Sequence, residues 1–366
     1  MIDESPLPSY EGDNLVNLVA ELEIRLTGRS PTRGLRPDLA DLIPHGRNYL
    51  LVVIDGLGDY QLAPLSARRL RQSRRAVLKA PFPTTTAVGL SSIATALAPL
   101  QHGVIGYTQW MPSVGRVVNM MQWAHTSGWG RIDTDPSGFL PSPNLWERLN
   151  AARVRAVIFH PRIFDRTPFS SMLYRGAELY GYSSPFEVRP SAYWDYRGAT
   201  LLIVYVSSVD SNAHMSGQGS WGYSKALEDT GLLWKRLAAR LPSDTVMVGT
   251  SDHGHCDIPP DGKMRLSKRL TEDMKCWGDG RVLMFTGPTT RVRQLADQTG
   301  ARYVDAQQLR EWLGGGDPHP QLVDFPAAAL LAPPDTVILP HYLGTHLVGH
   351  HGGITPRELL IPLLVA

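Results

Sequence analysis

The sequence predicts an α/β fold with a doubly wound, mostly parallel central sheet, helices on both faces and an inserted cap lobe. Short, almost wholly apolar runs recur along the chain, as expected of strands that are buried on both faces. Segments with helical spacing lie between these runs, which gives the alternating order of an α/β protein. The 366 residues, 43% of them hydrophobic, exceed the roughly 250–300 residues of a single hydrophobic core. We therefore expect a main domain with a second lobe.

The predicted elements follow in chain order. Residues 1–47 are expected to form a helix and a linker that pack on the core, because apolar residues at helical spacing follow the N-cap candidate Asp13-Asn14 and stop before Gly28. Helical patterns also occupy Pro64–Ala76, Ser91–Ala98 and Lys225–Leu241. The expected strands are Tyr49–Ile54, Val154–Phe159, Thr200–Val206, Thr245–Gly249, Val282–Phe285, Thr336–Leu339 and Leu359–Val365.

Residues 48–106 and 198–366 are expected to form the core, which is interrupted by an inserted region at 107–197. In this region the strand pattern weakens and aromatic residues accumulate. Two interpretations of these rings stay open: packing within a cap, or stacking against a flat substrate group. The rings are Trp110, Trp123, Trp129, Trp146, Tyr174, Tyr180, Tyr182 and Trp194.

Charge and cysteine content argue against several classes of protein. The 36 basic and 34 acidic residues give a formal net charge of +2, so coating by nucleic acid is not expected. Cys256 and Cys276 are the two cysteines, too few for a disulfide framework and typical of a reducing compartment. The N-terminus is acidic and interrupted by prolines, unlike a secretory signal. The apolar runs fall far below the ~20 residues of a membrane span, so we expect a cytoplasmic protein without one.

Side chains that bind metals follow the ends of the predicted strands. In open α/β sheets, ligands bind beyond the carboxyl ends of the strands. Four such segments occur, and each of them alone is typical of a turn or cap. Independent turns would not all contain residues that can bind metals, however. Asp and neutral His bind Zn²⁺ or Mn²⁺, and a mixed set can hold two ions about 4 Å apart. The segments are Asp55-Gly56, Asp210 to His214, Ser251 to His255, and Gly349 to Gly353.

Three consecutive threonines precede a helical pattern. A hydroxyl of Thr84, Thr85 or Thr86 would lie at a helix N-terminus, where backbone N–H groups and the helix dipole attract an anion such as phosphate. The simpler interpretation is a helix cap. Beside two metal ions, such a hydroxyl is also a competent nucleophile at neutral pH.

In this order, the motifs resemble the alkaline phosphatase superfamily, and within it most closely the nucleotide pyrophosphatase/phosphodiesterase (type I phosphodiesterase) family. The resemblance covers most of residues 49–366. It also rests on a His-Gly pair at His102, sixteen residues after Thr86, which implies that Thr86 is the nucleophile. The matched motifs are Asp55-Gly56, Pro83 to Thr86, Thr95 to Gly103, Asp210 to His214, Ser251 to Gly254, and His351-Gly352.

The resemblance implies a two-metal hydrolase. One divalent ion would be bound by Asp210, His214 and His351, and Zn²⁺ is expected with Mn²⁺ as the alternative. The other ion would be bound by Asp55, Thr86, Asp252 and His253. The implied reaction is hydrolysis of a phosphodiester or pyrophosphate bond in a small, nucleotide-like phosphate ester. Thr86 attacks phosphorus, and water then cleaves the phosphothreonine.

Two departures from the family pattern, and the absence of a motif found in another branch, bear on the assignment. The family's Phe-Pro-Asn, whose asparagine binds a phosphate oxygen, is replaced by Ala87 to Gly89. His255 and His350 are additional, and we interpret them as side chains that hold ligands in place. The Cys-x-Pro-x-Arg motif of the sulfatase branch is missing, which excludes its cysteine-derived nucleophile.

Several alternatives therefore stay open. They are a phosphomonoesterase, a phosphonate hydrolase, a phosphoryl-transfer enzyme of the same superfamily, and a non-catalytic binder of phosphate ligands. As substrates of this chain, we expect diesters to be preferred over monoesters. The extra negative charge of a monoester usually meets a fixed cation, and the motifs around Thr86, Asp210 and Asp252 contain no Lys or Arg.

Overall fold

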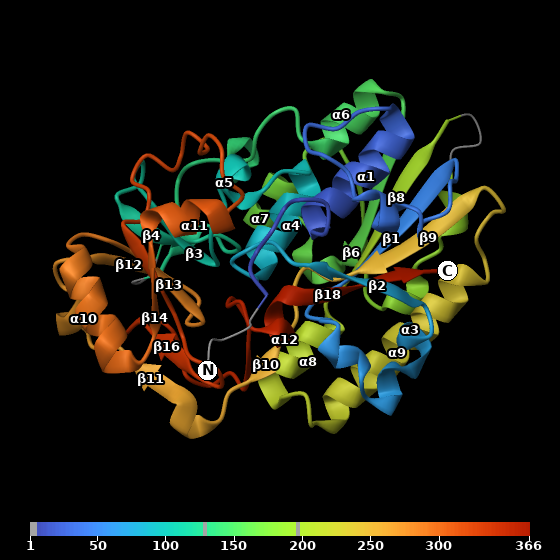
Figure 1. The fold of residues 1–366 in the computed structure, drawn as a ribbon. Coiled ribbons are helices and arrows are strands. Elements are labelled where there is room, and N and C mark those ends of the chain that lie inside the picture. Colours follow the sequence, from blue (N-terminus) through green and yellow to red (C-terminus); the bar gives the residue numbers. More distant parts are fainter. Residues whose placement is uncertain (1–5, 127–129, 195–197) are drawn as a thin grey trace.

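The computed structural model describes residues 6–126, 130–194 and 198–366. Its centre is a seven-stranded sheet in the order β2-β18-β9-β1-β8-β6-β7 (Figure 1). From β9 to β7 neighbouring strands are parallel, whereas β18 is antiparallel to both β9 and β2. The predicted fold class is therefore confirmed. The strands are β1 Asn48–Ile54, β2 Arg74–Lys79, β6 Arg155–Pro161, β7 Glu178–Tyr182, β8 Thr200–Val206, β9 Thr245–Thr250 and β18 Leu360–Val365.

The apolar run of β1 explains why it lies at the centre of the sheet. All seven of its residues are buried, since each face of the strand packs on a separate hydrophobic cluster. In register, Leu50 pairs with Leu202 of β8 and Met247 of β9. Side chains that alternate along β1 reach opposite faces, so Leu51 joins one cluster and Leu50 the other.

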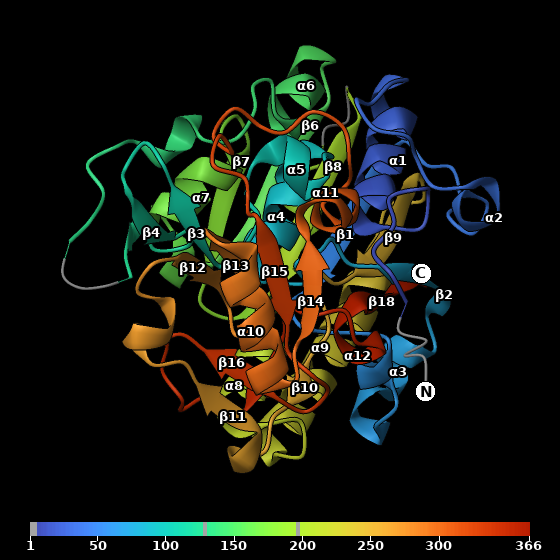
Figure 2. The same cartoon turned by 60° about the vertical axis from the view of Figure 1, so that its left-hand side comes forward.

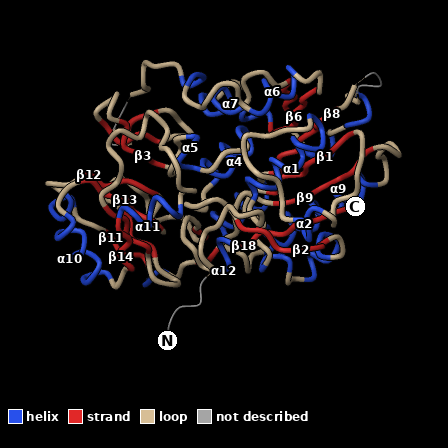
Figure 3. Tube along the Cα trace, turned by 45° about the horizontal axis from the view of Figure 1, so that its top comes forward, coloured by secondary structure: helices blue, strands red, loops and turns tan. Residues whose placement is uncertain are grey.

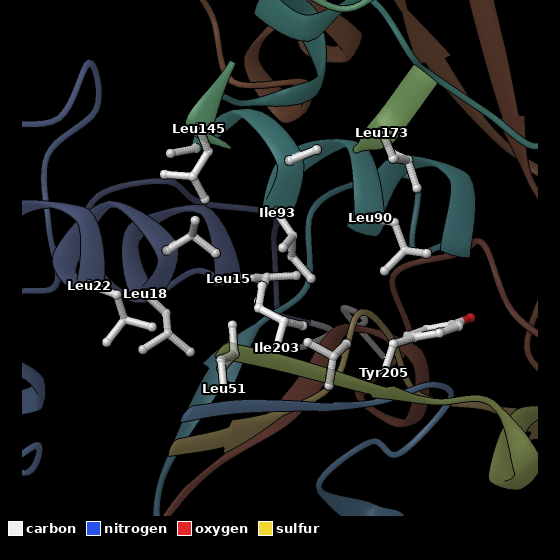
Figure 4. Close-up of a cluster of buried hydrophobic side chains, with 14 of the residues drawn as sticks. Leu15, Leu18, Leu22, Leu51, Leu90, Ile93, Leu145, Leu173, Ile203 and Tyr205 are labelled. Carbon is white, nitrogen blue, oxygen red and sulfur yellow. The ribbon is translucent and has the colours of Figure 1, made fainter. Parts of the chain in front are cut away.

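Helices cover both faces of this sheet. Figure 4 shows the cluster on one face, where Leu18 of α1 and Ile93 of α4 lie near Leu51 and Ile203 of the sheet. Asn14 caps α1 and Gly28 ends it in the left-handed conformation, as predicted. The helices of this face are α1 Leu15–Thr27, α4 Thr86–Thr95, α6 Leu145–Ala151 and α7 Pro168–Leu173, and those of the other face are α3 Arg68–Arg71, α8 Ser208–Ser216 and α9 Trp221–Ala238.

A second, smaller sheet forms the other lobe (Figures 2 and 3). It is antiparallel, in the order β12-β13-β15-β14. A three-stranded ribbon, β3-β4-β5, joins it because the Thr108 hydroxyl donates to the Gly278 carbonyl at 2.7 Å. These strands are β3 Thr108–Met111, β4 Arg116–Asn119, β5 Ala124–His125, β12 Lys275–Gly278, β13 Val282–Thr286, β14 Arg302–Asp305 and β15 Ala328–Leu331, and the lobe also contains α10 Thr289–Thr299 and α11 Ala306–Trp312.

Short elements complete the chain. Two further pairs of strands are β10 with β17 and β11 with β16. None of the described helices is long and apolar enough to cross a membrane. The remaining elements are α2 Pro37–Ala40, α5 Pro99–His102, α12 Pro356–Leu359, β10 Cys256–Asp257, β11 Lys263–Arg265, β16 Val337–Leu339 and β17 Gly349–His350.

Three sequence predictions need correction. The runs Val282–Phe285 and Thr336–Leu339 do contain strands, but outside the central sheet, because apolar content indicates burial and not the partner strand. The pattern at Pro64–Ala76 was expected to be one helix. It is a 3-10 turn, Leu65–Ala67, followed by α3 and the start of β2. The helix expected at Ser91–Ala98 begins earlier, at Thr86.

The expected division at residues 107 and 197 does not follow the sheets. The stretch 107–197 supplies β6 and β7 to the central sheet and α6 and α7 to one of its faces. Within it, the ribbon β3-β4-β5 joins the second lobe. Most of the second lobe is built from the chain between β11 and β16, which the sequence analysis placed in the core.

Candidate metal centre

The expected metal-binding side chains come together at one edge of the central sheet. Asp55 directly follows β1, Asp210 lies in the first turn of α8 after β8, and Asp252 follows β9. Because β8, β1 and β9 are adjacent and parallel, their carboxyl ends lie side by side. The segment with His351 reaches the same place because it precedes β18, which runs in the opposite direction.

One group consists of Asp210, His214, His255 and His351, whose ligand atoms all lie within 4.8 Å of one another. Nε2 of His214 is 3.1 Å from Nε2 of His351 and 3.4 Å from Oδ1 of Asp210. The Nδ1–H groups of His214 and His351 each face a backbone carbonyl at 2.8 Å, at Gly349 and Thr84 respectively. Donation from Nδ1 leaves a lone pair on each Nε2. Two lone pairs at this distance repel unless a cation lies between them, so the group fits a metal ion.

The neighbouring group surrounds the Thr86 hydroxyl. Ligand atoms of Asp55, Asp210 and His253 lie within 4.8 Å of one another. Nε2 of His253 is 3.0 Å from Oγ1 of Thr86, 3.3 Å from Oδ1 of Asp55 and 3.6 Å from Oδ2 of Asp252. Nδ1 of His253 faces the carbonyl of Gly254 at 3.0 Å, which again directs its Nε2 toward the group. Oδ2 of Asp252 is buried without a hydrogen-bond partner, as expected of an oxygen meant for a cation.

The titratable groups of this centre lie close together and shift one another's pKa values. Burial, together with the nearby carboxylates of Asp210 and Asp252, raises the pKa of Asp55 well above its usual range. Burial also favours the neutral form of Asp210, but His214 and His255 outweigh it and lower its pKa. For His351, burial and the neighbouring histidines lower the pKa well below its usual value, so its imidazole is neutral and able to bind a metal.

The structure distinguishes the three threonines. Thr85 is the N-cap residue of α4, and Thr86 is its first residue. The Thr84 hydroxyl donates to the carbonyl of Gly353 and accepts from the N–H of Gly352, so it braces the loop after His351. Of the three hydroxyls, that of Thr86 faces the carboxylates and imidazoles, 3.5 Å from Oδ1 of Asp55 and 3.0 Å from Nε2 of His253.

The segment that replaces the family's asparagine packs inward. Ala87 and Val88 are fully buried in the core on the α4 side of the sheet. A Cβ at Gly89 would lie only 2.6 Å from Cβ of Asp252. Glycine is therefore needed there for α4 to approach the metal centre this closely.

A cavity of about 520 Å³ opens over the centre, and we call it the main cavity. Asp55, Thr86, Asp210, His214 and His351 line it, together with mainly apolar and aromatic side chains. The described residues that line it include no Lys or Arg. A third carboxylate, that of Asp279, also lines it, and burial raises its pKa to about 7.

The aromatic residues that line this cavity are not the ones singled out from the sequence. Trp110 donates its Nε1–H to Asp324 and is covered by the Lys275 ammonium 3.9 Å from its ring centre. Trp123 packs edge-on against Phe139. Neither tryptophan lines the main cavity, so of the two interpretations that the sequence left open, packing describes Trp110 and Trp123. Trp129 lies outside the described residues. The rings that do line it are Tyr107, Phe164 and Tyr205.

The two additional histidines differ in their surroundings. Nε2 of His255 is 2.8 Å from Oδ1 of Asp210, and its Nδ1 is buried without a partner. It therefore lacks the carbonyl contact that orients His214, His253 and His351. Nε2 of His350 faces the carbonyl of Leu347 at 3.3 Å.

One residue at this centre, Tyr205, is not among those that the motifs identify. Its hydroxyl donates to Oδ2 of Asp55. The available signal is a tyrosine hydroxyl in a mainly apolar run, one residue before the carboxyl end of β8.

Comparisons with known proteins agree with this arrangement. The model of the type I phosphodiesterase / nucleotide pyrophosphatase family matches residues 49–313. The chain belongs to this family. It is accordingly an enzyme that hydrolyses phosphate esters, and the resemblance described from its motifs is confirmed. A search of curated proteins finds no match.

Solved structures of low sequence identity share the fold. Murine ectonucleotide pyrophosphatase/phosphodiesterase 5 superposes with a TM-score of 0.65 at 18% identity, covering 86% of this chain and 87% of that one. An inactive threonine-to-alanine variant of that mouse protein, in complex with AMP, has a TM-score of 0.62 at 17% identity, with coverage of 86% and 87%. Phosphonoacetate hydrolase from Sinorhizobium meliloti 1021, in complex with phosphonoacetate, has a TM-score of 0.63 at 14% identity, with coverage of 88% and 91%.

Proposed function

We propose that this member of the family hydrolyses phosphodiesters or pyrophosphates with Thr86 as nucleophile and two divalent metal ions, Zn²⁺ or Mn²⁺. The observation that carries the proposal is the set of ligand atoms around one hydroxyl. Oγ1 of Thr86 lies 3.0 Å from Nε2 of His253 and 3.5 Å from Oδ1 of Asp55, next to a second group that shares Asp210.

Two sets of residues would hold the ions. Asp210, His214 and His351 form one set, and Asp55, Thr86, Asp252 and His253 form the other. When bound, the ions would lower the charge on the phosphoryl group and favour loss of a proton from a nearby hydroxyl. The short contact between Nε2 of His214 and His351 and the unpartnered Oδ2 of Asp252 support this assignment.

The reaction would proceed in two displacements. Oγ1 of Thr86 forms a bond to phosphorus and loses its proton, while the ester oxygen opposite departs with its electron pair. Water then attacks the same phosphorus, and Oγ1 of Thr86 leaves and regains a proton. Thr86 begins α4, so the helix dipole favours the negative charge that develops next to it.

The lining of the main cavity supports diesters as the preferred substrates. A monoester brings an additional anionic oxygen, whose binding is usually supported by a fixed cation. The described lining residues contain three aspartates, Asp55, Asp210 and Asp279, and no Lys or Arg. The same argument weighs against a phosphonate with a carboxylate, such as the phosphonoacetate bound in the bacterial hydrolase of similar fold.

The test is a rate comparison on the purified protein with Zn²⁺ or Mn²⁺. We expect an aryl diester to be hydrolysed with a higher kcat/KM than the matching monoester or phosphonate. A monoester advantage of tenfold or more, about 1.4 kcal/mol, would favour the phosphatase alternative. Thr85→Ala is the matched control for Thr86→Ala, and loss of activity in the Thr85 variant alone would move the nucleophile by one residue.

We also propose a cytoplasmic, reducing location. Cys256 and Cys276 are both buried and unpaired, which supports the proposal. Fractionation of cells that express the tagged protein would test it, and recovery outside the cytoplasm would refute it.

A further inference from the structure

A second cavity adjoins the main one, and we call it the side cavity. Its volume is about 330 Å³. Tyr107, Met121, Phe164 and Tyr205 line both cavities. Because the Tyr205 hydroxyl donates to a carboxylate oxygen of the metal centre, this shared wall stands next to the place where phosphate would bind. A substituent on that phosphate can therefore extend into the side cavity.

Most of the wall surface of the side cavity is apolar. Leu90 of α4 and Phe169 and Leu173 of α7 are buried there. Ile163 lines the cavity and is 81% exposed, so it stands at the opening. No described residue that lines this cavity is Asp, Glu, Lys or Arg. These surroundings favour an apolar group and disfavour a charged one.

Most of its polar side chains already have partners within the protein. Nε2 of His160 lies 2.9 Å from a carboxylate oxygen of Asp165. The Thr167 hydroxyl donates to that of Ser170, which in turn donates to the Phe164 carbonyl at 2.7 Å. A buried polar ligand group without a partner is unfavourable. A nucleobase would bring several such groups, whereas an alkyl or aryl group brings none.

We propose that the side cavity binds an uncharged, apolar ester group of the substrate, so that the enzyme's substrates are phosphodiesters with an alkyl or aryl substituent rather than a nucleoside. This proposal rests on the proposed function, because the phosphate must bind at the metal centre for its substituent to reach the side cavity. Each methylene that leaves water should raise kcat/KM by roughly fourfold.

The test compares p-nitrophenyl phosphodiesters whose second ester group is methyl, hexyl or thymidine. We expect kcat/KM for the hexyl ester to exceed that for the methyl ester by at least tenfold, and the thymidine ester to show no such gain. Ile163→Glu places a charge at the opening and should lower the hexyl-to-methyl ratio severalfold. Val323→Glu is the matched control, because Val323 is 78% exposed and lines neither cavity.

The outcomes separate this proposal from the proposed function. Equal rates for hexyl and methyl esters, or a faster thymidine ester, would overturn the side-cavity proposal while phosphodiesterase activity stands. An unchanged ratio in Ile163→Glu would also overturn it. If none of the three diesters is hydrolysed in the presence of metal, the proposed function fails instead, and the side-cavity proposal falls with it.

Discussion

A buried ion pair connects two loops of the candidate metal centre, and its removal should destabilise the protein. The Arg281 guanidinium and the Glu358 carboxylate are 1% and 0% exposed. They form two parallel hydrogen bonds of 2.9 and 2.8 Å. The same carboxylate accepts from the N–H of Gly353 at 2.9 Å, and the Glu358 carbonyl accepts from the N–H of Gly254 at 2.8 Å. The pair therefore connects the loop after His351 with the loop after His253.

Arg281→Met should lower the free energy of unfolding by about 3–5 kcal/mol, because it leaves a buried carboxylate without its partner. An unfolding entropy of about 2.1 cal/mol/K per residue gives roughly 0.8 kcal/mol/K for this chain, so Tm should fall by about 4–6 °C. The double variant Arg281→Met with Glu358→Leu should regain most of the loss. Arg33→Met removes an exposed pair with Glu11, whose side chains are 60% and 80% exposed, and should cost less than about 1 kcal/mol.

Urea unfolding followed by circular dichroism measures these differences, and its pH dependence gives an independent check. Burial alone would raise the pKa of Glu358, but the Arg281 guanidinium outweighs it and the pKa is lowered. A carboxyl group with a lowered pKa in the folded state adds stability above its unfolded pKa, and this stability is lost as the pH falls through the folded pKa. The difference between wild type and Arg281→Met should therefore shrink below about pH 4. A loss no larger than that of Arg33→Met at neutral pH would refute the reasoning.

Three further predictions concern the metal centre. Thr86→Ala should lower kcat by several powers of ten while the protein stays folded and retains bound metal, measured by diester hydrolysis and metal analysis. His255→Leu should weaken metal binding about 10–100-fold. His255→Gln keeps an N–H donor for Asp210 and should bind the metal within a few-fold of wild type. Competition with a chelator measures both affinities, and equal affinities for the two variants would contradict a hydrogen-bonding role of His255. Tyr205→Phe removes the donor to Asp55 and should weaken metal binding at least about tenfold in the same assay, and unchanged affinity would show that this hydrogen bond does not hold the carboxylate.

The central strands could be predicted because burial on both faces demands continuous apolar runs, as in β1 and β8. Strand β2 was missed for the opposite reason. It lies at the edge of the sheet, and Arg74 and Arg75 at its start are exposed, as is common for edge strands. Its charged sequence therefore resembles the continuation of a helix. The run that contains β13 predicts burial correctly, but nothing in the four apolar residues Val282–Phe285 identifies which sheet the strand will join.

The grouping of the candidate metal ligands could be predicted because they lie close after the strand ends, so that the fold class alone brings them together. Tyr205 could not be distinguished from a core aromatic residue, since its hydroxyl acquires a role only when Asp55 is placed next to it. For Trp110 and Trp123 the sequence cannot decide between packing and stacking, because aromatic content indicates both equally well. Trp110 donates a hydrogen bond to Asp324, which is far away along the chain. Trp123 packs against Phe139, which belongs to another element.

The most direct test of the central claim is mass spectrometry of the enzyme quenched with acid during turnover of an aryl phosphodiester. The two-displacement mechanism predicts a phosphoryl adduct, still carrying the second ester group, on the peptide that contains Thr86 and absent from Thr86→Ala. An adduct on Thr84 or Thr85, or full turnover by Thr86→Ala, would contradict the assignment of Thr86 as the nucleophile.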